Sequence, residues 1–195
     1  MATPTPAGSR PSTGGTERQI LDAVGQIIAT EDFDAVSMRR VAAKADVSLS
    51  TVVRHFGTKD ALLAALVSDG GEDEERDELR RNMEPGDVMA AVRAVVTDYE
   101  EAGQQLLHML AQEHRFPALS ELLDLGRRGH RTWVRWAFSP QLGRRRGAKR
   151  TQLEDLLVVA TDVYTWKQLR RDRGLDRSTT EQRIHALVAA LTTQE

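Results

Sequence analysis

Residues 37–66 read SMRRVAAKADVSLSTVVRHFGTKDALLAAL, a stretch that predicts two short helices joined by a tight turn. Ser37 and Ser48 each precede an apolar helical pattern, and their hydroxyl oxygens can accept hydrogen bonds from the first N–H groups of a helix. Asp46 falls at the turn, where a short polar side chain tolerates a left-handed backbone. Gly57 is placed to end the second helix. Together these features predict a helix-turn-helix, the motif that inserts its second helix into the major groove of DNA.

The second helix of this stretch has one apolar face and one face directed to solvent. Val52 and Phe56 are expected to point inward, and the residues expected outward are Leu49, Ser50, Val53 and Arg54. From Ser37 to Lys59 the chain has five Arg or Lys and a single Asp. The same spacing occurs in ordinary helical hairpins, but a locally cationic segment in a chain of net charge -2 favours contact with DNA phosphates.

The composition limits the class of protein. The chain has 195 residues and no cysteine, which excludes disulfides and cysteine-ligated metal sites. No apolar run approaches the ~20 residues that a membrane span requires. Residues 1–15 are rich in Pro, Gly, Ser and Thr and lack the apolar centre of a signal peptide. We therefore expect a flexible tail on a soluble, cytoplasmic protein.

Apolar residues recur at helical spacing along the rest of the chain, with no alternating strand pattern, so the fold is predicted to be all-α. We expect an N-terminal three-helix domain over residues 16–68, whose first helix runs from about Thr16 to Thr30, and a second helical domain over residues 69–195. Within the second domain the pattern predicts separate helices near residues 88–99 and 106–110, a helix weakened midway by Gly126 and Gly129, a basic loop over residues 139–150, and a last helix capped by Ser178.

Residues 18–66, RQILDAVGQIIATEDFDAVSMRRVAAKADVSLSTVVRHFGTKDALLAAL, resemble the DNA-binding domain of the tetracycline-repressor-like (TetR/AcrR) family of bacterial transcription regulators. The resemblance combines the first helix, the loop around Phe33, the helix-turn-helix and the element Phe56-Gly57-x-Lys59-x-x-Leu62. It implies that residues 69–195 form a helical bundle that binds a small-molecule effector and dimerises. It also implies a double-stranded DNA operator as partner.

The resemblance assigns individual DNA contacts. Ser37 matches a position whose hydroxyl usually holds a phosphate, and His55 and Lys59 match two further phosphate contacts. Arg54 can also donate two parallel hydrogen bonds to guanine, whereas Leu49 either contacts a thymine methyl group or is simply an exposed helix residue. The complete set of DNA-binding candidates is Ser37, Arg39, Ser48, Leu49, Ser50, Arg54, His55 and Lys59.

Two residues depart from the family pattern. Val53 stands where many members have a Tyr that contacts the DNA backbone, so one phosphate contact is expected to be missing. Asp46 replaces the usual Gly of the turn, which preserves the turn but brings a negative charge close to DNA. Both changes bear on the affinity for DNA rather than on the fold.

The second domain holds most of the aromatic side chains, interleaved with polar groups, as in small-ligand pockets between bundle helices. The candidates for effector contact are Tyr99, Met109, Trp133 and Trp136. Aromatic residues at helical spacing are also typical of an ordinary core, so each of the four has core packing as its alternative.

The last two helical patterns have wide apolar faces that suit a four-helix bundle between two copies of the chain, as the resemblance also implies. The dimer candidates are Leu153, Leu156, Leu157, Val163, Ile184, Leu187, Val188 and Leu191. The alternative is that both helices only close the core of one copy. A homodimer suits the mechanism, because two recognition helices related by a two-fold axis read a pseudo-palindromic operator.

Other polar clusters give weaker signals. His108 and His114 are six residues apart and so do not share one face of a helix, and the adjacent Glu113 and His114 point apart. We therefore expect no metal site, no cofactor and no enzyme activity. The basic run Arg144–Arg146 with Lys149 and Arg150 could contact nucleic acid, although a solvated loop is favoured.

The sequence therefore predicts a homodimeric, ligand-responsive transcriptional repressor that is released from its operator by a small-molecule effector. The alternative is a helical protein-interaction module in which the helix-turn-helix is structural only.

Overall fold

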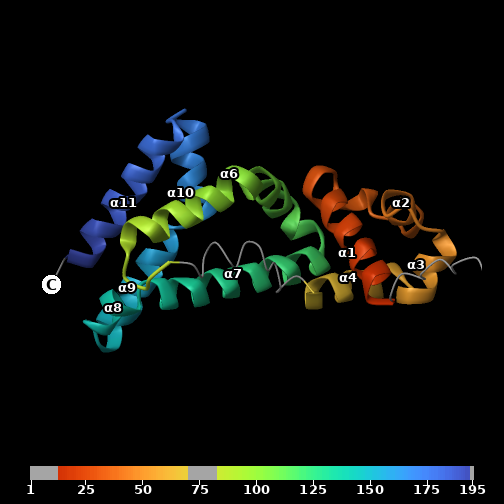
Figure 1. Ribbon diagram of the computed structural model, residues 1–195, viewed down its shortest axis with the longest axis horizontal. Coiled ribbons are helices and arrows are strands. Elements are labelled where there is room, and N and C mark those ends of the chain that lie inside the picture. The colour runs from red at the N-terminus through yellow and green to blue at the C-terminus, as the bar shows by residue number, and fades with distance from the viewer. Residues whose placement is uncertain (1–12, 70–82, 194–195) are drawn as a thin grey trace, which may run out of the picture. The chain divides into compact units, whose positions relative to one another are not determined.

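The computed structural model describes residues 13–69 and 83–193, which form helices and no β-strand, as the all-α prediction requires. The chain divides into two compact units, residues 1–69 and 70–195 (Figure 1). In the described ranges, no helix is long and apolar enough to cross a membrane.

The N-terminal unit is built around helix α1, which packs against the short helices that follow it. Helix α1 begins at Thr13, earlier than expected, because its apolar pattern starts only at Ile20 and so does not fix where the first turn begins. The rest of the expected tail, residues 1–12, lies outside the described residues. The elements are α1 (Thr13–Thr30), η1 (Phe33–Ala35), α2 (Met38–Lys44), α3 (Leu49–Phe56) and α4 (Lys59–Asp69). Its buried core includes Ile20, Val24, Ile27, Ile28, Phe33, Val36, Val41, Val52 and Leu62.

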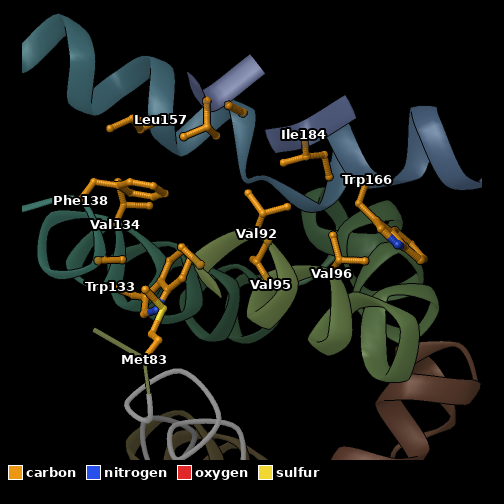
Figure 2. Packing of buried hydrophobic residues seen from close by; sticks show 14 of the residues in the cluster. Met83, Val92, Val95, Val96, Trp133, Val134, Phe138, Leu157, Trp166 and Ile184 are labelled. Atoms are coloured by element: carbon orange, nitrogen blue, oxygen red, sulfur yellow. The ribbon is translucent and has the colours of Figure 1, made fainter. Parts of the chain in front are cut away.

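The C-terminal unit is a bundle whose core draws side chains from every long helix, as Figure 2 shows. Trp166, Phe138 and Leu157 are fully buried in it. The elements are α6 (Val88–Gln112), η2 (Glu113–Arg115), α7 (Pro117–Ala137), α8 (Ser139–Gly143), α9 (Gly147–Ala160), α10 (Val163–Lys167), the π-helical turn η3 (Gln168–Asp172) and α11 (Arg177–Thr193).

Helix α6 is continuous, so the prediction of two separate helices near residues 88–99 and 106–110 was wrong. Gly103 lies inside α6, where the lack of a side chain allows close packing and does not interrupt the helix. A Cβ atom on Gly103 would lie 2.7 Å from Cζ3 of Trp166, closer than carbon atoms approach one another. Helix α7 likewise runs without interruption through Gly126 and Gly129.

The basic segment 139–150 is not a loop throughout, because α8 and the first turn of α9 occupy most of it. Burial of Leu142 fixes α8 against the core. At the last helix the prediction of a Ser178 cap was also wrong. A capping residue precedes the first turn of its helix, and α11 begins at Arg177. The cap is Asp176, whose carboxylate accepts a hydrogen bond from the N–H of Thr179 at 2.7 Å.

A partly buried ion pair joins α6 to the π-helical turn. The Nε of Arg170 donates to Glu100 Oε1 at 2.8 Å, and the indole N–H of Trp166 donates to the same oxygen at 2.9 Å. Burial alone would raise the pKa of the Glu100 carboxyl, but the hydrogen bonds from Arg170 and Trp166 hold it below its usual value.

Candidate nucleic-acid interface

The first half of the helix-turn-helix is stabilised at both ends by local hydrogen bonds. Ser37 Oγ accepts the N–H of Arg40 at 3.3 Å, which caps α2. After α2 the backbone reverses at Asp46, whose φ of 50° lies in the left-handed region, as predicted. The N–H of Val47 then donates to the carbonyl of Ala42 at 3.0 Å and closes the turn. The direction in which α3 leaves the turn is therefore fixed by the backbone.

Helix α3 has the cap, the stop and the faces that the sequence predicted. Ser48 Oγ accepts the N–H of Thr51 at 3.1 Å, and Gly57 ends the helix with φ 72°. Val52 and Phe56 are buried and attach α3 to the unit. The opposite face is therefore available to a partner.

The exposed face of α3 combines polar, cationic and apolar side chains. Ser50 and Arg54 are exposed, and neither Leu49 nor Val53 is covered, with 39% and 45% of their surfaces accessible. Leu49 and Val53 are four residues apart and so share one side of the helix. Exposed apolar side chains next to the exposed guanidinium of Arg54 suit a thymine methyl group beside a guanine edge.

Several cations of the motif have no intramolecular counter-charge. Within the described residues, Arg39, Lys44 and Arg54 form no ion pair. Arg40, in contrast, is paired with Glu31. Three uncompensated cations around two short helices give this surface the charge that phosphate binding requires.

Lys59 and His55 flank the end of α3 and the start of α4. The ammonium of Lys59 lies 5.5 Å from the centre of the Phe33 ring, which holds it near the first turn of α4. Thr58 Oγ1 accepts the N–H of Ala61 at 3.1 Å and caps that turn. His55 is half-buried, with its ring 6.2 Å from that of Phe56. A lysine at a helix N-terminus is favourably placed for a phosphate.

One feature of this unit was not predicted from the sequence. A shallow hollow of about 390 Å³ lies between α1 and the end of α2. Gln19 spans part of it by donating to the carbonyl of Ala45 at 2.8 Å. Arg18 and Lys44 also line it. The sequence identified Lys44 as one of the cations of the helix-turn-helix but gave no signal for the hollow itself.

The four effector candidates have different environments in the C-terminal unit. Tyr99 and Trp133 are buried in the core, with 7% and 8% of their surfaces exposed. Met109 is half-buried on α6, and Trp136 is exposed on α7. Trp133 stacks on His130 with ring centres 5.7 Å apart.

Thr161, at the end of α9, connects the helices that carry Tyr99 and Trp133. The hydroxyl of Tyr99 donates to the carbonyl of Thr161 at 3.1 Å. The hydroxyl of Thr161 lies 3.1 Å from Nε2 of His130. Next to it, Asp162 caps α10, and burial raises the pKa of its carboxyl. The sequence gave no signal for this polar junction, because its members are far apart in the chain.

The eight dimer candidates separate by burial. The side chains that the monomer itself buries are Leu153, Leu157, Val163, Ile184 and Val188. Leu191 is half-buried, whereas Leu156 and Leu187 are 41% and 47% exposed. Val159, which the sequence did not single out, is 63% exposed. The apolar surface available to a second copy on α9 and α11 is therefore narrower than predicted.

The polar cluster near the end of α6 is occupied by intramolecular contacts. Arg127 donates to Glu113 at 2.7 Å and holds the pKa of that carboxyl below its usual value. Nε2 of His108 lies 2.9 Å from the amide nitrogen of Gln112. In the part of the chain that the structure describes, no three His, Cys, Asp or Glu side chains are grouped to hold a metal ion.

The N-terminal unit matches a known sequence family. Residues 20–66 fit the model of bacterial regulatory proteins of the tetR family. The chain is 34% identical over 108 residues to the HTH-type transcriptional repressor Rv3405c of Mycobacterium tuberculosis. That match covers 54% of this chain and 55% of the relative, so it spans about half the length of each protein.

Solved structures extend the likeness of fold to nearly the whole chain. GusR of Salmonella enterica superposes with a TM-score of 0.70 at 18% identity, covering 95% of this chain and 100% of GusR. A TetR-family member from Streptomyces coelicolor gives a TM-score of 0.61 at 19% identity, covering 88% of this chain and 97% of its own. At these identities the likeness concerns the fold.

Proposed function

We propose that this chain is a cytoplasmic, DNA-binding transcriptional regulator of the tetR type, because its residues 20–66 fit the model of that family of bacterial regulatory proteins. The observation that carries the proposal is the exposed face of α3, where Arg54 lies beside Leu49 and Ser50 and has no ion-pair partner among the described residues. This face presents a cation, a hydroxyl and an apolar side chain to a base edge. The name of the Mycobacterium relative supports repression as the outcome of binding.

We further propose that the regulator binds a pseudo-palindromic operator as a homodimer. The exposed apolar side chains of α9 and α11, namely Leu156, Val159 and Leu187, support a self-association surface in the C-terminal unit. One short recognition helix reads few base pairs, whereas two helices related by a two-fold axis read two half-sites about one helical turn apart.

A small-molecule effector is proposed to bind the C-terminal unit and release the DNA. The contacts of Tyr99 and His130 with Thr161 support this proposal, because they tie α6 and α7 to the end of α9, a proposed dimer helix. An effector that separates these contacts would change how the dimer helices meet. Its effect on DNA binding equals its differential affinity for the two conformations.

The decisive experiment is binding of the full-length chain to DNA from upstream of its own gene. Arg54→Ala is expected to weaken binding about 10–100-fold, because a lost bidentate contact to guanine costs about 1–3 kcal/mol. Lys59→Ala should weaken binding to all sequences and reduce the slope of affinity against salt by about one unit. Arg183→Ala, which removes an exposed arginine of α11, is the matched control and should bind as the unmodified chain does.

Two results would overturn the proposal. The first is no binding to any upstream fragment. The second is an Arg54→Ala affinity equal to that of the Arg183→Ala control. Either result would favour a helical interaction module in which the helix-turn-helix is structural only.

A further inference from the structure

A second concentration of positive charge lies in the C-terminal unit, at the bend between α8 and α9. We define the basic bend as the side chains of Arg144, Arg145, Arg146, Lys149 and Arg150. Residues 125–153 contain nine Arg or Lys and no Asp or Glu, in a chain whose net charge is -2. The charge of the bend is therefore a local property and not a reflection of the whole chain.

The carboxylates that follow the bend are used by other arginines. Arg135 of α7 donates to Glu154 at 2.8 Å, and Arg131 of α7 lies 3.7 Å from Asp155. These pairs fasten α7 to α9. Within the described residues, none of the five side chains of the basic bend forms an ion pair or a hydrogen bond. Four of them are exposed and Arg145 is half-buried.

The basic bend is held in place from both sides. Leu142 before it and Leu153 after it are buried in the core. The side-chain amide of Gln141 donates to the carbonyl of Gly86 at 2.9 Å, which fixes α8 to the start of the unit. The backbone that carries the cations is thus ordered before any partner binds. Binding therefore does not have to meet the free-energy cost of ordering it.

We propose that the basic bend binds the phosphate backbone of duplex nucleic acid, as a site additional to the helix-turn-helix. Five uncompensated cations within seven residues suit a regular row of phosphates. The described residues place no exposed large apolar side chain between residues 139 and 155. Aromatic stacking strengthens binding to single strands and inserted apolar groups strengthen binding to membranes, so a cationic surface without either favours a duplex.

Binding at the basic bend carries no sequence information. Contacts to phosphates fix position and affinity, whereas base edges are read in the grooves. A homodimer would carry two such bends in addition to its two recognition helices. The bends would raise the affinity for DNA of any sequence and make that affinity strongly dependent on salt.

The test removes the helix-turn-helix contribution first. In full-length Arg54→Ala/Lys59→Ala protein, binding to a random-sequence DNA duplex is measured across a range of salt concentrations. Arg144→Gln/Arg146→Gln/Arg150→Gln is then added to this background. The matched control adds Arg93→Gln/Arg173→Gln/Arg183→Gln, which removes the same charge from exposed positions elsewhere in the C-terminal unit. Circular dichroism checks that both proteins are folded.

We expect the Arg54→Ala/Lys59→Ala protein to retain salt-dependent binding to the duplex. The matched control in the same background should bind equally well. The bend variant should lose about tenfold or more in affinity at low salt, and its salt slope should fall by about 0.9 unit for each phosphate contact removed. Equal affinities of the bend variant and the control would overturn the proposal. Binding to anionic phospholipid vesicles without binding to the duplex would also overturn it. Neither result bears on operator recognition, which the Arg54→Ala experiment with the otherwise unmodified chain tests separately.

Discussion

The helix-turn-helix and the C-terminal bundle use positive charge in opposite ways. In the first, Arg39, Lys44 and Arg54 have no ion-pair partner among the described residues. In the second, arginines such as Arg170 and Arg135 join helices that are distant in sequence by pairing with half-buried carboxylates. Paired arginines hold the bundle together, whereas unpaired ones mark a surface that suits an external anion. Among the described residues of the bundle, the basic bend brings five such unpaired cations together within seven residues.

The two regions also differ in how their helices are secured. The helices of the first are short and rely on local caps at Ser37, Ser48 and Thr58. The bundle relies on contacts between residues far apart in sequence, such as that between Trp166 and Glu100. All three tryptophans lie in the bundle. Tryptophan fluorescence therefore follows unfolding of the bundle alone, and circular dichroism follows both regions.

The largest effect is expected from Trp166→Ala. Trp166 is fully buried, donates a hydrogen bond to Glu100 and lies against Gly103, so the change leaves a large cavity. The free energy of unfolding of the bundle should fall by about 3–5 kcal/mol in urea unfolding followed by fluorescence. Trp136→Ala is the matched control. Because 36% of the surface of Trp136 is accessible, its removal should cost less, and equal losses would contradict the assigned burial.

A smaller, pH-dependent effect is expected from Glu100→Gln. Burial raises the pKa of Glu100, but the hydrogen bonds from Arg170 and Trp166 outweigh it and hold the pKa below its usual value, so the ion pair stabilises the fold at neutral pH. At pH 7 the variant should lose roughly 1–2 kcal/mol of unfolding free energy. As the pH falls through the usual range of a glutamate, the unfolded chain takes up the proton first, so the advantage shrinks and is lost once the pH is below the lowered pKa of Glu100 in the folded chain. A difference in unfolding free energy between the two chains that stayed constant from pH 7 to pH 3.5 would contradict a role of the ion pair.

The smallest effect is expected from Ser48→Ala, which removes the cap of α3. Loss of an N-cap costs about 1 kcal/mol, and the change lies in the N-terminal unit, so the transition seen by circular dichroism should shift while that seen by fluorescence stays. Ser178→Ala is the control, because Ser178 does not cap α11. If fluorescence shifted equally, the two units would unfold together and the contrast between them would not hold for stability.

The local features of the helix-turn-helix were predictable from the sequence. Ser37, Asp46, Ser48 and Gly57 each act on backbone groups within a few residues, so their types and spacing were sufficient to place the caps, the turn and the end of α3. The division of α3 into a buried and an exposed face followed from the helical spacing of its apolar residues. Whether the exposed residues contact DNA remains a prediction.

The C-terminal unit was less predictable because its details depend on distant residues. The glycine at position 103 is explained by the indole ring of Trp166 and not by its own neighbours in the chain. Likewise, Tyr99 and His130 meet at Thr161 only after folding. The apolar faces of α9 and α11 were recognised, but a helical pattern cannot separate a residue that its own monomer buries, such as Leu157, from one left exposed, such as Leu187.

The π-helical turn at Gln168–Asp172 has a consequence for insertions and deletions among relatives. Its backbone closes from the N–H of Arg173 to the carbonyl of Gln168, one residue wider than an α-helical turn. The extra residue lets two neighbouring arginines diverge, since Arg170 reaches Glu100 and Arg171 lies 5.1 Å from the ring of Trp166. A deletion of one residue here would leave an ordinary α-helical turn, with one residue fewer to carry these contacts. Relatives one residue shorter at this turn should therefore lack one of the two arginine contacts.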